Sequence, residues 1–176
     1  MRPWPSAVYD WHSTADERTR ALDCDGLLPH ADQCLTRAID VAAPARTVFR
    51  WLCQLRVAPY SYDWIDNLGR RSPRELTPGL EQLEAGQRFM AIFRLSSFDP
   101  GRSITLESRS RLFGHVACTY SVEDAGAASS RVLVRFLVLY APASRWLMSV
   151  VLPPGDLVMM RRQLLNIGAL AAADAS

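Results

Sequence analysis

The sequence predicts an α+β domain in which a curved antiparallel sheet wraps around one long C-terminal helix. Alternating segments joined by short turns lie between residues 88 and 140, and short connectors between successive strands are typical of an antiparallel meander. A run of good helix formers follows, from Leu157 to Ala172. A curved sheet with one apolar face needs a cover, so we expect this helix to lie across that face.

The predicted C-terminal helix has a marked start. Pro153 and Pro154 disfavour a helix that continues from upstream, and Asp156 is a good N-cap because its carboxylate accepts a bond from a first-turn N–H. At ~1.5 Å per residue the helix is about 25 Å long, enough to cross a small domain. Burial of its four large apolar side chains contributes roughly 6–12 kcal/mol. The apolar stripe of this helix consists of Leu157, Met160, Leu164, Ile167 and Ala171. The polar side opposite it holds Arg161, Arg162 and Asn166.

Composition sets the class of protein. The chain has 176 residues, 49% hydrophobic and 22% charged, which is typical of a folded globular protein of one domain. The formal net charge is only +2, so we expect no nucleic-acid partner. The four cysteines have no metal-type spacing, which favours buried free thiols in a reducing, cytoplasmic location.

No segment is expected to target or span a membrane. The first residues hold no apolar core of signal-peptide length. The most apolar long run, 132–152, is interrupted by Arg135, Pro142 and Arg145, whereas a spanning helix needs about 20 mostly apolar residues. We therefore expect no stable membrane insertion.

The chain divides into an N-terminal arm, 1–33, and a single domain, 34–176. The first twelve residues have no periodicity and predict an extended segment. Ser13 or Thr14 can cap a short helix that runs to about Leu22, with an acid at capping-box distance.

The domain opens with a strand and two short helices. Residues 35–41 alternate, with Arg37 as the discordant member of the apolar side. Pro44 suits the first turn of a helix over 45–55. Asp63 begins a second short helix, which Gly69 ends.

Four more strands are predicted, and their alternation indicates one dry face and one wet face. Ser108 lies on the apolar side of its strand, together with Ile104 and Leu106. Arg131 and Arg135 lie on the polar side of the last strand. The following segment, 143–152, is compatible with a short helix or a final strand. The four predicted strands are 88–95, 102–109, 115–123 and 131–140.

Three segments in this order resemble the START-like helix-grip superfamily, often labelled SRPBCC. They are the opening strand and Ala-Pro helix over 37–52, the Tyr-Ser-Tyr-Asp-Trp segment that starts at Tyr60, and the closing helix over 156–170. The second and third segments are similar to those of one uncharacterised bacterial branch. The resemblance implies a deep pocket between sheet and C-terminal helix. The superfamily includes lipid-transfer domains, plant allergens that hold apolar molecules, and polyketide cyclases or aromatases.

Aromatic side chains are the main candidates for contact with a ligand. Tyr60, Tyr62 and Trp64 alternate, so an extended stretch would point all three one way. Such side chains suit a pocket that orients a ligand, or they plug one end of the core. The candidate ligand-binding residues are Trp51, Tyr60, Tyr62, Trp64, Phe93, Arg94, Tyr120, Phe136, Met160 and Leu164.

Four residues are weak candidates for catalysis: Tyr62, Asp63, Arg94 and His115. Asp63 lies three residues from Asp66, which fits a catalytic pair or a helix cap with surface ion pairs. His115 is a general base if it faces the cavity, and otherwise a surface histidine at a strand end. Arg94 either faces inward, toward an anionic head group, or pairs outward with neighbouring strands.

The sequence holds no metal motif, phosphate loop or nucleophile elbow, so we expect no metal and no cofactor. The leading hypothesis is a protein, monomer or homodimer, that binds a small apolar or aromatic molecule for transport or sensing. A cyclase or aromatase-like enzyme is the second hypothesis. The third is an interaction or stress-related module with a filled core, in which the apolar 146–152 stretch is a dimer face or touches a membrane.

Overall fold

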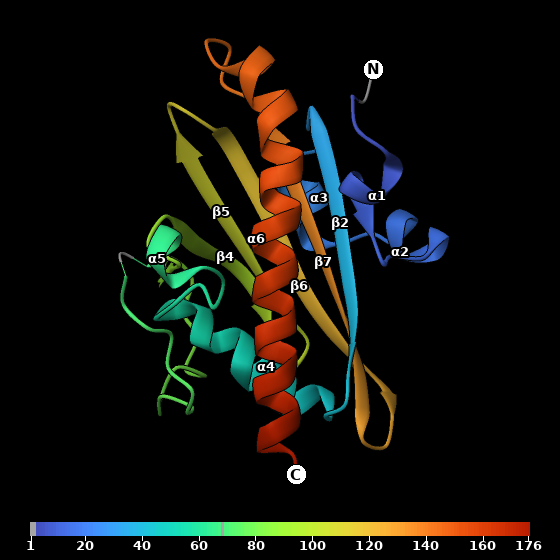
Figure 1. Cartoon of the computed structure of the whole chain (residues 1–176), viewed down its shortest axis with the longest axis vertical. Coiled ribbons are helices and arrows are strands. Elements are labelled where there is room, and N and C mark those ends of the chain that lie inside the picture. Colours follow the sequence, from blue (N-terminus) through green and yellow to red (C-terminus); the bar gives the residue numbers. More distant parts are fainter. Residues whose placement is uncertain (1–2, 68) are drawn as a thin grey trace.

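A computed structural model describes residues 3–67 and 69–176, except for the side chain of Asp66. One sheet of seven strands forms the frame, and α6 (Arg145–Asp174) lies across its face (Figure 1). The strand order is β1-β2-β7-β6-β5-β4-β3, with β1 parallel to β2 and all other neighbours antiparallel. The strands are β1 (Asp10–Trp11), β2 (Gln33–Val41), β3 (Arg88–Phe89), β4 (Phe93–Asp99), β5 (Ser103–Ser110), β6 (Gly114–Gly126) and β7 (Ser129–Leu139).

Short helices precede and follow the first long strand. The two that follow this strand sit where the sequence predicts them: α4 is followed by one 3-10 turn, and α5 begins at Asp63 and ends near Gly69, whose φ is +77°. The predicted capping box is present, because Thr14 and Glu17 exchange side-chain to backbone bonds at the start of α2. The helices are α1 (Ser6–Tyr9), α2 (Ala15–Thr19), α3 (Asp23–Leu27), α4 (Ala45–Cys53) and α5 (Asp63–Asp66), with the 3-10 turn over Gln54–Arg56.

The C-terminal helix is longer than predicted. α6 runs without interruption through Pro153 and Pro154, so the undecided 143–152 segment is helical over most of its length. The expected start at Asp156 is wrong: this residue lies inside the helix, where all but 9% of its side chain is buried. Tertiary contacts override the local proline preferences here, because the second half of the helix packs on β2 and α4 and Pro153 itself is buried.

The N-terminal segment supplies one hydrogen bond that the helix lacks because of its prolines. Pro154 has no N–H, so the carbonyl of Val150, four residues earlier, lacks its usual helical donor. The indole Nε1 of Trp4 donates to this carbonyl at 2.8 Å. The arm is thereby joined to the first half of α6.

The lower half of α6 packs closely on β2 and α4. Met160, Leu164, Ile167 and Ala171 are buried, as the predicted stripe requires. Gly168 allows the close approach to β2: a Cβ there would lie 3.2 Å from Cδ1 of Ile39.

The second face of the sheet is only partly wet, which corrects the sequence prediction: Arg109 and Glu123 on this face are exposed, but another part of it is covered. α3 lies against this face (Figure 1). A small apolar cluster joins Cys24 and Leu28 to Leu137 on β7. Arg135, expected on the polar side, is only 4% exposed. Its guanidinium donates to three backbone carbonyls of the arm, to Glu17 at 2.9 Å among them.

The predicted strand 88–95 is two strands that form a hairpin. β3 pairs antiparallel with β4, so that Phe89 lies opposite Phe93. Met90 and Ala91 reverse the chain with φ values of +44° and +62°. These angles are unusual for residues other than glycine, and no turn motif marks them in the sequence.

No helix in the described part of the chain is long and apolar enough to cross a membrane. All four cysteines are free, and three of them are buried. Within the same residues, no group of three or more His, Cys, Asp or Glu side chains is placed to hold a metal ion.

Candidate functional site

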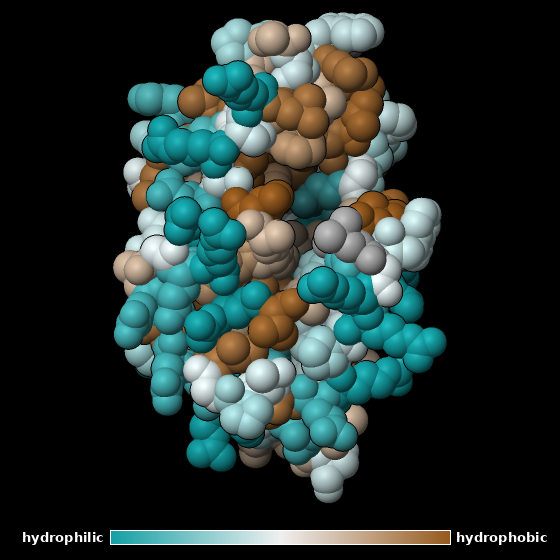
Figure 2. All heavy atoms as spheres, turned by 90° about the vertical axis from the view of Figure 1, so that its left-hand side faces the viewer, coloured by the Kyte–Doolittle hydropathy of each residue, from teal (hydrophilic) through white to brown (hydrophobic). Residues whose placement is uncertain are grey.

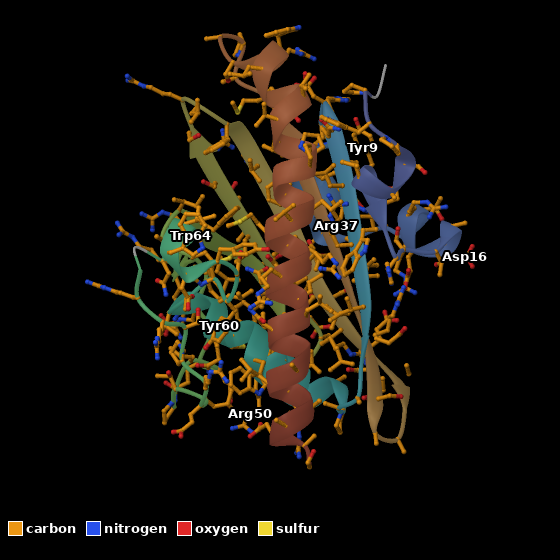
Figure 3. All side chains as sticks on the ribbon, viewed as in Figure 1. Tyr9, Asp16, Arg37, Arg50, Tyr60 and Trp64 are labelled. Atoms are coloured by element: carbon orange, nitrogen blue, oxygen red, sulfur yellow. The ribbon has the colours of Figure 1, made fainter. Side chains whose placement is uncertain are left out.

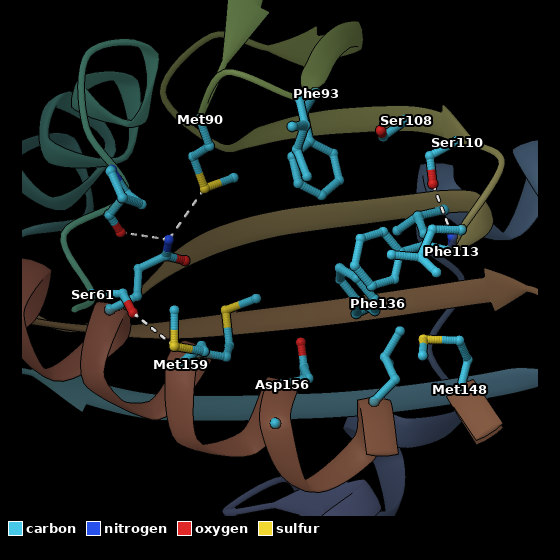
Figure 4. Close-up of a pocket in the computed structure, with 18 of the residues that line it drawn as sticks. Ser61, Met90, Phe93, Ser108, Ser110, Phe113, Phe136, Met148, Asp156 and Met159 are labelled. Carbon is cyan, nitrogen blue, oxygen red and sulfur yellow. Dashed lines mark hydrogen bonds between the residues drawn. The ribbon is translucent and has the colours of Figure 1, made fainter. Parts of the chain in front are cut away.

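A cavity of about 600 Å³ lies between the sheet and the upper half of α6 (Figure 4). Its sheet wall is mainly apolar, because alternate residues of each strand point toward the helix. Phe93, Val116, Tyr120 and Phe136 come from β4, β6 and β7 and form this wall.

The helix wall is flexible as well as apolar. Met148, Leu152, Met159 and Met160 line it, and Met90 faces them from the turn between β3 and β4. Unbranched thioether side chains adapt to ligands of different outline. The volume and the lining match those of ordinary small-molecule pockets.

One acidic side chain interrupts the helix wall. Figure 4 shows the carboxyl group of Asp156 pointing from α6 into the cavity. Its Oδ2 accepts a bond of 2.8 Å from Nη2 of Arg37, which is fully buried on β2 between the sheet and α6 (Figure 3). Burial raises the pKa of Asp156 above its ordinary value, and the charge of Arg37 acts in the opposite direction.

A second polar group closes the inner end of the cavity. The Tyr120 hydroxyl donates to Oε1 of Gln163 at 2.7 Å, and Nε2 of Gln163 donates to the Pro59 carbonyl at 2.7 Å. Burial raises the pKa of Tyr120 well above its ordinary value. The phenol is therefore neutral, and its hydrogen already has an acceptor.

Four of the ten residues proposed as ligand contacts line the cavity. They are Phe93, Tyr120, Phe136 and Met160. The first three lie at inward positions of predicted strands, and the fourth lies on the predicted helix stripe. Periodicity alone therefore locates them.

The remaining aromatic candidates lie elsewhere. Tyr60 has φ +55°, which breaks the alternation, and it is buried edge-on against Trp51 with ring centroids 6.1 Å apart. Trp64 lies on α5 and is 76% exposed (Figure 3). Tyr62 stands 6.0 Å from the guanidinium carbon of Arg162. Leu164 is fully buried in the core below the cavity.

The other polar candidates also lie outside the cavity. Arg94 is exposed and donates to the Gly86 carbonyl. His115 follows a cavity-lining glycine and precedes a cavity-lining valine, so it points to the opposite face, where Nε2 lies 3.2 Å from Oε2 of Glu107. Asp63 accepts a bond from the backbone N–H of Ser72, and the side chain of its expected partner Asp66 is outside the described residues.

Sequence reasoning missed the polar residues of the site. The sequence predicts a helix cap at Asp156, and no local pattern marks Gln163. A signal for the first was available, because Arg37 is the one charged residue on the apolar side of its strand and requires a buried partner. Ser108, placed on the apolar side of β5 by its alternation, does line the cavity.

Exposed hydrophobic side chains surround the upper end of the molecule. The upper part of the face in Figure 2 is rich in hydrophobic residues, and the surface is hollowed below them. Leu112, Phe113 and Val151 both line the cavity and reach the surface, and Trp146 is 83% exposed. The cavity therefore opens beside an apolar rim.

Comparisons with known proteins support the fold. No protein-family profile matches the chain, and no curated protein matches its sequence. A hypothetical protein from Helicobacter pylori is similar in structure with a TM-score of 0.54 and 12% identity, over 86% of this chain and 95% of that one. A protein from Thermus thermophilus gives a TM-score of 0.52 and 16% identity, over 81% and 99%.

An aromatase/cyclase from a Streptomyces species also aligns, with a TM-score of 0.44 and 17% identity over 81% of this chain and 93% of its own. At identities this low, likeness shows the fold alone. The sheet with α6 across it, together with the likeness to the Helicobacter pylori and Thermus thermophilus proteins, confirms the predicted α+β helix-grip fold. The START-like superfamily stays a resemblance of the sequence. The assignment to one bacterial branch stays a prediction.

Proposed function

We propose that this protein binds a small hydrophobic or aromatic molecule between the sheet and α6. The observation that carries the proposal is the apolar cavity of about 600 Å³. Pockets for small molecules have volumes of roughly 300–1,000 Å³ and mostly apolar walls with a few polar groups. Transport or sensing of such a molecule needs no catalytic residue, which agrees with the absence of a catalytic motif from the sequence.

A filled core receives less support. That hypothesis requires large side chains to occupy the interior, yet Trp64 and Trp146 are 76% and 83% exposed. Trp51 is a buried residue of α4 that packs against Tyr60, and it does not line the cavity.

Native mass spectrometry of freshly purified protein tests the proposal, followed by denaturing extraction of whatever adds mass. We expect one discrete adduct of a few hundred daltons. Met159→Arg should remove it, because the new side chain enters the cavity. Val158→Arg is the matched control, since Val158 is the preceding helix residue and is 53% exposed. If the Met159→Arg variant carries the same adduct in the same proportion of molecules as the wild type, the assignment of the ligand to this cavity is wrong.

One observation favours a second candidate, an enzyme of the cyclase or aromatase type. A carboxylate whose pKa is raised by burial is a stronger general base, and Asp156 is such a group in the cavity wall. The four residues that the sequence suggests for catalysis lie outside the cavity, so Asp156 alone supports this candidate. Chromatography of a flexible polyketone incubated with the protein tests it: we expect cyclised product that Asp156→Asn abolishes, and an unchanged substrate contradicts it.

A further inference from the structure

The polar atoms that face the cavity determine which ligands it accepts. Asp156 offers one carboxylate oxygen to Arg37, and among the described residues Oδ1 has no hydrogen-bond partner. The carboxyl group points into the cavity (Figure 4). A carboxylate oxygen accepts hydrogen bonds and donates none.

Arg37 fixes the charge of Asp156 but is not available to a ligand. Its Nη1 donates to the carbonyls of Tyr9 and Thr36, at 2.7 and 3.1 Å, and its Nη2 donates to the carbonyl of Val8 at 2.9 Å. The guanidinium is fully buried. Protonation of Asp156 would leave that cation without a counter-charge, so Arg37 favours the carboxylate form.

The second polar group at the inner end is also an acceptor. Tyr120 has its hydroxyl hydrogen on Gln163, so only the lone pairs of its oxygen remain for a ligand. The amide hydrogens of Gln163 already have acceptors, because Nε2 donates to the Pro59 carbonyl at 2.7 Å and to the Met90 sulfur at 3.2 Å.

No cationic side chain lines the cavity within the described part of the chain. An anionic ligand would meet the Asp156 charge in an apolar surrounding, where repulsion between like charges is strong. A neutral ligand without a polar group would leave Oδ1 of Asp156 unpaired, which carries the penalty of a buried polar atom. A ligand with its own donor hydrogen avoids both costs.

We propose that the ligand is an apolar or aromatic molecule that carries a neutral or cationic hydrogen-bond donor, such as an alcohol, a phenol or an amine, which bonds to Oδ1 of Asp156. The charge of Asp156 disfavours fatty acids and other carboxylates whose acid group lies beside it. This inference rests on the proposed function and names the class of its ligand.

Four fluorescent probes with one ring system test the inference on the wild-type protein: pyrene, pyrenemethanol, the methyl ether of that alcohol, and pyrenecarboxylate. Titration at neutral pH gives the dissociation constant of each. We expect the alcohol to bind about tenfold or more tightly than the ether and the carboxylate, the factor that corresponds to a hydrogen bond to a charged group. The ether keeps the shape of the alcohol and lacks only the donor hydrogen.

The Asp156→Asn variant tests whether Asp156 itself causes the preference for the alcohol. Arg37 only donates, so the amide oxygen must face it and the NH₂ group must face the cavity. The variant therefore presents a donor where the wild type presents an acceptor, and the preference of alcohol over carboxylate should fall at least tenfold. Asp40→Asn is the control, because Asp40 lies on the same strand as Arg37 with 82% of its side chain exposed.

The outcomes separate the two proposals. If the ether or the carboxylate binds the wild type as tightly as the alcohol, the inference is overturned and the proposed function stands. If none of the four probes binds up to its solubility, the proposed function is overturned and the inference with it. The wild-type comparison decides the matter even if Asp156→Asn fails to fold.

Discussion

Arg37 on β2 and Asp156 on α6 form an ion pair across 119 residues of sequence, with Nη2 2.8 Å from Oδ2. The arginine side chain is fully buried, and the aspartate side chain is 9% exposed. The pair joins the first long strand of the sheet to the middle of the C-terminal helix, where the cavity begins. The same guanidinium binds carbonyls of the N-terminal arm, so one cation connects three parts of the fold.

Loss of either partner should destabilise the protein strongly. Arg37→Met leaves the Asp156 carboxylate unpaired and removes the donors to the arm carbonyls, so we expect a loss of about 3–5 kcal/mol in the free energy of unfolding. Asp156→Leu leaves the buried cation without its counter-charge. Urea denaturation of the two single variants and the double variant measures both effects.

The double variant is the diagnostic one. Because each single change leaves the other charge isolated, the double loss should be smaller than the sum of the single losses by about 1–3 kcal/mol. Strict additivity would mean that the pair is not formed in solution. Arg37→Met alone should also increase proteolysis of the arm, since the carbonyls of Val8 and Tyr9 lose this donor.

The architecture follows from local patterns in the sequence. Strand alternation and the apolar stripe of the last helix each span a few neighbouring residues, and each reports which side chains face the core. Inward positions of strands and helix therefore identify Phe93, Tyr120, Phe136 and Met160 as cavity residues. The turn at Met90 and Ala91 cannot be predicted from such patterns, because their positive φ values come from the surrounding structure.

The polar part of the site depends on contacts that local patterns do not contain. Gln163 bonds to the carbonyl of a residue 104 positions earlier, and Asp156 bonds to one 119 positions earlier. The proline pair illustrates the same limit. Propensity ends the helix at Pro153, whereas the burial of Pro153 and the indole of Trp4 support a continuous helix.

Acid should destabilise the protein through Glu17. Its carboxylate binds Nε and Nη2 of Arg131, at 2.8 and 3.0 Å, and this bonding lowers its pKa to about 2. The lowered pKa means that the contribution to stability is present above the ordinary value of 4.5 and is lost as the pH falls toward 2. Glu17→Gln should remove roughly 1.5–3 kcal/mol at neutral pH.

The pH profile separates the ion pair from other effects of acid. The difference in unfolding free energy between wild type and Glu17→Gln should shrink as the pH falls below the ordinary carboxyl range. Asp16→Asn is the control, because Asp16 lies in the same first helical turn and is exposed. A difference that stays constant down to low pH would refute the assignment.

Gly114 should tolerate no side chain. Its φ is +86°, and a Cβ would overlap the Leu139 carbonyl oxygen and lie 2.5 Å from the Ala141 nitrogen. Gly101 has nearly the same φ, +81°, but a Cβ there would have no atom within 4 Å. We expect Gly101→Ala to cost about 1–2 kcal/mol from backbone strain, and Gly114→Ala to cost a further 1–3 kcal/mol or so from overpacking. Equal losses in thermal unfolding would show that the turn between β5 and β6 relaxes freely.

The bond between Trp4 and Val150 should hold the first half of α6 in place. Trp4→Phe keeps an aromatic ring but removes the N–H that donates to the Val150 carbonyl, so we expect a loss of about 0.5–1.5 kcal/mol. Amide hydrogen exchange should become faster over 145–152, where Met148 and Val151 line the cavity. Trp64→Phe is the control, because that side chain is 76% exposed.

A second substitution shows whether the missing proline N–H is the reason for this bond. Pro154→Ala restores an N–H four residues after Val150, which can donate to the same carbonyl within the helix. Trp4→Phe should therefore cost less in the Pro154→Ala background than in the wild type. An equal cost in both backgrounds would mean that the indole stabilises the arm through packing alone. Reduced cost, together with slower exchange over 145–152, would show that the arm replaces a hydrogen bond that the helix itself does not provide.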